Sequence, residues 1–116
     1  MPTSSVIAGF GLFVIGHILA WFQLNSQFVW QWWQKHPIFT VALYAVPTGL
    51  CFLMGSRLIV EATGALWTSR FLAFSASYLA FPLLTWHFMG ETMLTTKTMV
   101  CVLLSCMIVA VQLFWK

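Results

Sequence analysis

Charged side chains are the scarcest feature of this 116-residue chain. Asp, Glu, Lys and Arg together make up 6% of it, as five basic and two acidic residues, whereas a soluble domain usually carries about 25%. A chain of this length could not bury an apolar fraction of 61% in a water-soluble core. A lipid bilayer can take up that surface, so the composition excludes an ordinary soluble domain.

Other absences narrow the class further. The basic residues are single and scattered, without the patch that nucleic-acid binding needs. No nucleophile–base pair, Gly-rich phosphate loop or metal-ligand spacing is present, so we expect neither an enzyme nor a cofactor. The three cysteines form no CxxC pair and are interpreted as small apolar residues. No Ser/Gly/Pro-rich linker divides the chain, which predicts a single domain over residues 1–116.

Four apolar segments fill most of the sequence. They are Val6–Leu24, Ile38–Met54, Leu66–Phe88 and Met99–Trp115. Helices of these lengths would cover about 25–35 Å, close to the ~30 Å hydrocarbon core of a bilayer. Backbone polar groups in lipid must be paired internally, which favours α-helices. We therefore predict an all-α integral membrane protein with four transmembrane helices.

The first connection, Asn25–Pro37, is rich in Gln and Trp. Trp prefers the headgroup region of a bilayer, so this segment is expected to lie along the membrane surface, as an extension of the first helix. An aromatic recognition surface is the alternative. Pro37 is suited to open the second helix, because the first helical position needs no N–H donor.

The remaining connections are predicted at Gly55–Ala65 and Met89–Thr98, with Thr95 or Thr96 as the N-cap of the last helix. Four spans put both termini on one side of the membrane. The basic residues divide three to two between the sides: Arg57, Arg70 and Lys116 against Lys35 and Lys97. This weak bias places the termini inside. It is also compatible with dual topology, in which the chain inserts both ways and pairs antiparallel.

Small residues predict where the helices touch, because lipid provides no hydrophobic drive between them. Two stripes follow helical spacing: Ser69, Ala73, Ala76 and Ala80 in the third span, and Gly9, Gly16 and Ala20 in the first. Two more polar stripes include Tyr44 in the second span and Gln112 in the fourth. The polar stripes either line a cavity or form hydrogen bonds across the bundle.

Two ionisable residues lie at membrane depth, where they are expensive. His17 is near the midpoint of the first span, and Arg70 is about one turn inside the third. His17 is either a neutral hydrogen-bonded side chain or a group that binds protons or substrate. Arg70 either extends to the interface or faces the bundle, where it would hold an anion or Glu61.

The C-terminal half resembles a known membrane superfamily. The run Trp86-His-Phe-Met-Gly-Glu91, followed by Lys97 and an apolar helix, resembles the closing helices of repeats in the drug/metabolite transporter superfamily. Gly64-Ala-Leu-Trp-Thr68 is similar to the start of the third helix in small multidrug-resistance proteins. Ala20-Trp21-Phe22 is similar to an uncharacterised four-helix family of the same superfamily.

This resemblance implies a homodimer with a substrate site between two four-helix subunits. Small multidrug-resistance exporters carry an essential Glu in the first span, whereas Val14 or His17 occupies that region here. A neutral, amphipathic or anionic substrate therefore fits better than a quaternary cation. The candidate pathway residues are His17, Tyr44, Arg70 and Gln112, and Gly90 with Glu91 forms the loop motif.

The leading hypothesis is a small transporter in the bacterial inner (cytoplasmic) membrane that contacts lipid and acts as a dimer. The alternative is a non-transporting subunit of a larger membrane complex, whose seven Trp and eleven Phe residues would pack on partner helices or lipids. A lipid-processing enzyme is disfavoured, because no acid/base pair is present.

Overall fold

The computed structural model describes residues 2–92 and 94–115. They form five helices: α1 (Pro2–Val29), α2 (Gln31–Lys35), α3 (Pro37–Thr63), α4 (Leu66–Met89) and α5 (Thr96–Phe114). All but α2 are long and apolar enough to cross a membrane. The all-α architecture with four candidate spans is confirmed, and it is that of a multi-pass integral membrane protein.

The predicted connection at Gly55–Ala65 is wrong, because α3 continues through it to Thr63. Only Gly64 and Ala65 separate α3 from α4. Gly55 does not interrupt the helix, since it is buried against α1 rather than placed in a turn. The helix ends where Gly64 adopts a left-handed conformation (φ 72°) and donates its N–H to the Val60 carbonyl.

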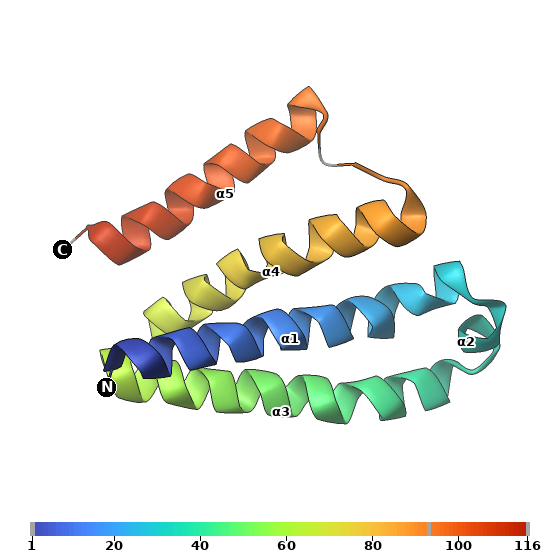
Figure 1. Ribbon diagram of the computed structural model, residues 1–116, viewed down its shortest axis with the longest axis horizontal. Helices are drawn as coiled ribbons and strands as arrows, with labels where there is room; N and C mark the ends of the chain where they lie inside the picture. The colour runs from blue at the N-terminus through green and yellow to red at the C-terminus, as the bar shows by residue number, and fades with distance from the viewer. Residues whose placement is uncertain (1, 93, 116) are drawn as a thin grey trace.

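The Trp-rich connection is partly helical. α1 extends beyond the predicted Leu24 to Val29, Trp30 is extended, and α2 is a single short turn. Pro37 opens α3 as predicted. Figure 1 places α2 at the end of the bundle opposite to the start of α1 and the end of α5.

The third connection is bounded by the end of α4 and the start of α5. Gly90 ends α4 in a left-handed conformation, and Thr95 is the N-cap of α5, where its side-chain oxygen accepts from the Thr98 N–H at 3.3 Å. Of the two N-cap residues predicted, the structure selects Thr95.

Helix α1 lies centrally and packs against both α3 and α4. The α1–α3 crossing is the tightest contact: a Cβ built on Gly9 would lie 2.6 Å from Ile59 Cγ1 and 2.9 Å from the Gly55 oxygen. Beside it, Phe13, Ile59 and Ala76 form the buried core. Ala76 and Ala80 of the predicted stripe are buried too, which confirms that end of the stripe as a helix contact.

Helix α5 is the exception. It packs on α4 alone, and none of its described residues is buried. In Figure 1 it lies beyond α4, away from α1 and α3. The helices thus form a flat arrangement of 48 × 36 × 18 Å, with α5 at its edge.

Candidate functional site

A cavity of about 820 Å³ lies between α1, α3 and α4; we call it the inter-helix cavity. Its lining combines aromatic and hydroxyl side chains with one imidazole and one guanidinium: Phe13, His17, Phe52, Ser56, Leu66, Trp67, Ser69, Arg70, Ala73, Phe74 and Ser77. His17 and Arg70, singled out from different spans of the sequence, are therefore brought to one cavity by the fold.

His17 joins α1 to α4. Its Nε2 lies 2.8 Å from the Ala73 carbonyl oxygen, and a carbonyl only accepts, so Nε2 carries the hydrogen and donates. The ring meets Phe52 of α3 edge to face, with 4.9 Å between centroids. The side chain is hydrogen-bonded, as one alternative predicted, and it also forms part of the cavity wall.

Arg70 forms no hydrogen bond or ion pair with any other described residue, so the pairing with Glu61, one of the alternatives for this side chain, is absent from this part of the chain. The preceding residue, Ser69, also lines the cavity; its side chain is 3% exposed and has no hydrogen-bond partner among the described residues. Ser56 is likewise without one. The Arg70 guanidinium and the hydroxyls of Ser56 and Ser69 therefore line one space without hydrogen-bond partners among the described residues.

No carboxylate is among the described residues that line the inter-helix cavity. Within residues 2–92 and 94–115 the acidic residues are Glu61 and Glu91, and both are exposed. An unopposed guanidinium is a donor suited to carboxylate, phosphate or sulfonate oxygens. The aromatic side of the cavity suits an apolar group, so the lining as a whole matches an amphipathic anion.

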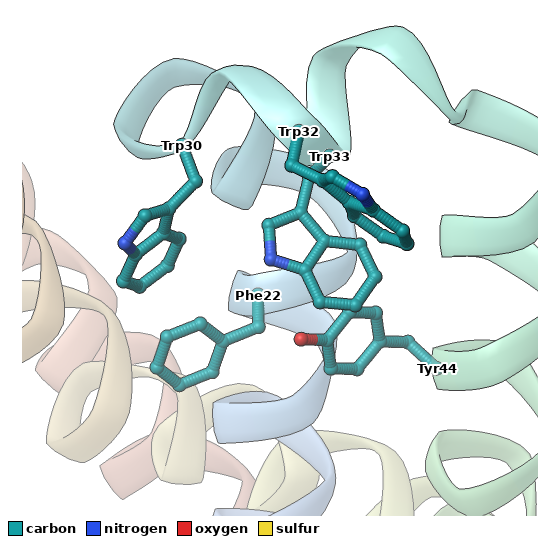
Figure 2. A pocket seen from close by; sticks show the side chains of 5 residues that line it. All are labelled: Phe22, Trp30, Trp32, Trp33 and Tyr44. Carbon is teal, nitrogen blue, oxygen red and sulfur yellow. The ribbon is translucent and has the colours of Figure 1, made fainter.

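A second hollow, of about 440 Å³, lies at the other end of the bundle. The described residues that line it are all aromatic, and we call it the aromatic recess: Phe22, Trp30, Trp32, Trp33 and Tyr44. Figure 2 shows them converging from α1, α2 with its N-cap, and α3. The Gln- and Trp-rich connection thus folds back over the helices that it joins.

The rings of the recess are in mutual contact. Phe22 stacks on Trp30 at 6.2 Å and on Tyr44 at 6.5 Å between centroids. Trp33 lies 5.3 Å from Tyr44 and 4.8 Å from Trp32. Such pairs stabilise one another by about 0.5–1.5 kcal/mol each beyond burial, which fixes the shape of the recess.

The other predicted site residues lie elsewhere. Tyr44 belongs to the aromatic recess and not to the inter-helix cavity. Gln112 lies on α5 and lines neither hollow. Gly90 is the C-cap of α4, and Glu91 follows it as an exposed residue. The polar stripe of α5 forms a cross-bundle hydrogen bond instead, between Tyr78 Oη and Ser105 Oγ at 2.9 Å.

Sequence reasoning missed Ser69 and Ser56 as cavity residues. Ser69 was assigned to a packing stripe. It lies one residue before Arg70, but consecutive helical residues point about 100° apart, so no signal in the sequence indicated that both line one cavity. Among the described residues, no group of three or more His, Cys, Asp or Glu side chains could hold a metal ion.

Comparison with known proteins gives no match: neither a family model, nor a curated protein, nor a solved structure is similar to this chain.

Proposed function

We propose that this chain is a small membrane transporter of the drug/metabolite transporter type, which works as a dimer and carries a small amphipathic substrate with an anionic headgroup. One observation carries the proposal. The inter-helix cavity holds Arg70 without an acidic partner among the described residues, beside His17 and a wall of aromatic rings.

The size of the cavity supports a small-molecule ligand. Its volume of about 820 Å³ lies within the ~300–1,000 Å³ of typical ligand sites. The charge supports an anion, because a cation at membrane depth is expensive unless it is neutralised, and the described residues supply no carboxylate there. An incoming anion would neutralise Arg70.

The flat arrangement supports a dimer. The helices extend 48 and 36 Å in two directions but 18 Å in the third, so one copy has too little depth to enclose a pathway on all sides. A second copy laid against the flat arrangement would supply the missing wall.

Substitution of Arg70 tests the proposal directly. We expect Arg70→Gln to lower uptake of pyrene sulfonate into proteoliposomes at least tenfold, with uptake of the neutral pyrenemethanol unchanged. Arg57→Gln is the matched control, since Arg57 is also exposed and basic but lies outside the cavity lining. Equal sulfonate uptake by both variants would refute the anion site.

His17 provides an independent test. We expect His17→Ala to abolish transport while expression continues, because the change removes the donor to Ala73 and opens the cavity wall. His17→Gln retains an N–H donor and is expected to recover part of the uptake. Normal transport by His17→Ala would remove the imidazole from the mechanism.

A second candidate function is a non-transporting subunit of a larger membrane complex. The packing of α5 favours it, since an apolar helix without buried residues leaves a face for another protein. Native mass spectrometry of the gently solubilised protein distinguishes the two. A homodimer supports the transporter, whereas a fixed stoichiometry with other chains supports the subunit.

A further inference from the structure

We propose that the aromatic recess binds a phosphocholine group, the headgroup of a zwitterionic lipid, with its quaternary ammonium among the rings. This site is separate from the inter-helix cavity and does not depend on the proposed transport. It is argued from the composition of the recess, its polar atoms and its place in the bundle.

Every described residue that lines the recess is aromatic. The faces of Trp, Tyr and Phe carry negative electrostatic potential and attract cations, most strongly quaternary ammonium groups, which are weakly hydrated. Phe22 forms the base in Figure 2, with Trp30 on one side and Trp33 and Tyr44 on the other. A trimethylammonium group would therefore meet rings from several directions.

A simple cation would find no counter-charge in the recess. Among the described residues, no carboxylate lines it. A zwitterion carries its own negative group and needs no carboxylate from the protein. The lining therefore favours phosphocholine over free choline.

Polar atoms for the phosphate are also present. The side chains of Trp33 and Tyr44 have no hydrogen-bond partner among the described residues. In Figure 2 the Trp33 indole nitrogen and the Tyr44 hydroxyl both turn toward the space beside Trp30 and Phe22. Both groups can donate to a phosphate oxygen.

The position of the recess matches the depth of lipid headgroups. It is formed where α1 ends and α3 begins, at the end of the bundle that carries α2. Those helices are candidate spans, so their ends lie near the membrane–water interface. A headgroup can enter there without leaving its own layer of the bilayer, which is why we assign the site to lipid.

The experiment uses the intact protein in phosphatidylglycerol nanodiscs, which contain no choline. Hexylphosphocholine is titrated, and the indole N–H signals of the tryptophans are followed by NMR. The comparison compound is its isostere in which a tert-butyl group replaces trimethylammonium. We expect the indole signals of Trp30 and Trp33 to shift, and hexylphosphocholine to bind at least about tenfold more tightly than the isostere.

Variants locate the site. Trp33→Leu is expected to weaken binding about tenfold, and Trp33→Phe, which keeps an aromatic ring, to weaken it less. Trp86→Leu is the matched control: Trp86 lies in the last turn of α4, is exposed and is outside the recess. The indole signal of Trp21, which donates to Thr85 inside the bundle, reports whether each variant is folded.

Four outcomes would overturn the proposal. Equal affinity for the isostere would show an apolar pocket without cation recognition. Unchanged binding by a folded Trp33→Leu would place the ligand elsewhere. Stronger binding of octyl glucoside than of hexylphosphocholine would make the recess a sugar-stacking surface. Binding of free choline as tight as that of hexylphosphocholine would remove the role of the phosphate and the assignment to a lipid headgroup.

Discussion

The α1–α3 contact and the α4–α5 contact show two ways in which membrane helices can neighbour one another. At the first, Gly9 and Gly55 allow the two backbones to meet, and Phe13 and Ile59 are fully buried beside them. At the second, α5 buries no described residue, and one side-chain hydrogen bond, from Tyr78 to Ser105, joins the helices.

This difference shows that apolar character does not determine packing in a membrane. α5 is the most apolar of the four candidate spans and the least buried. Lipid solvates apolar side chains as well as a protein interior does, so close contact requires small residues that allow the backbones to approach. The α5 sequence contains no glycine, and it stays at the edge.

The largest effect is expected at the glycine crossing. Gly9→Ala should lower the free energy of unfolding by about 2 kcal/mol, because the new Cβ meets the Gly55 backbone oxygen, which cannot move aside. Gly11→Ala is the control, since nothing lies within 4 Å of its Cβ position. Unfolding in bicelles by titration with dodecyl sulfate measures both. Equal losses of unfolding free energy in Gly9→Ala and Gly11→Ala would show that the glycine crossing is not the main contact.

A medium effect is expected where α1 meets α4. Trp21→Phe removes the indole N–H that donates to Thr85 in a buried hydrogen bond of 2.9 Å. It should lower the free energy of unfolding by about 1 kcal/mol. Trp86→Phe, on an exposed position, should cost little. A double-mutant cycle with Thr85→Val measures the coupling. A coupling energy of zero would mean that the packing of the Trp21 ring, and not the bond, holds this contact.

The smallest effect is expected at α4–α5. Tyr78→Phe removes the hydrogen bond to Ser105 and should lower the free energy of unfolding by about 0.5 kcal/mol. Amide hydrogen exchange in α5 should become faster. Ser77→Ala is the control, because the Ser77 hydroxyl bonds within α4, to the Phe74 carbonyl. A loss as large as that of Gly9→Ala would contradict the contrast between the two contacts.

Much of the fold could be predicted from the sequence. Each predicted span lies within a helix, apart from Trp115, which caps α5, and the small residues Gly9, Ala76 and Ala80 mark contacts as expected. These features depend on local composition and helical periodicity. The end of α3 was missed because Gly55 resembles a helix terminator in sequence, and only its neighbour α1 shows why it belongs inside a helix.

The candidate sites were less predictable. His17 and Arg70 were recognised singly, because any ionisable residue at membrane depth is conspicuous. That they share a cavity while Tyr44 lies in a separate aromatic recess depends on how α1, α3 and α4 cross. The residue types along each span do not indicate how the spans cross one another.

The sequence by itself determined that the chain is built for lipid, with four apolar helices and few charges. Hydropathy and backbone hydrogen bonding act over a single helix, so they can be recognised without a fold. The tertiary structure alone decided that Arg70 has no acidic partner among the described residues, that Trp30 and Trp33 close over Phe22, and that α5 lies at the edge. These features depend on distances between segments that are far apart in the chain. The shapes of the side chains at each helix crossing set those distances.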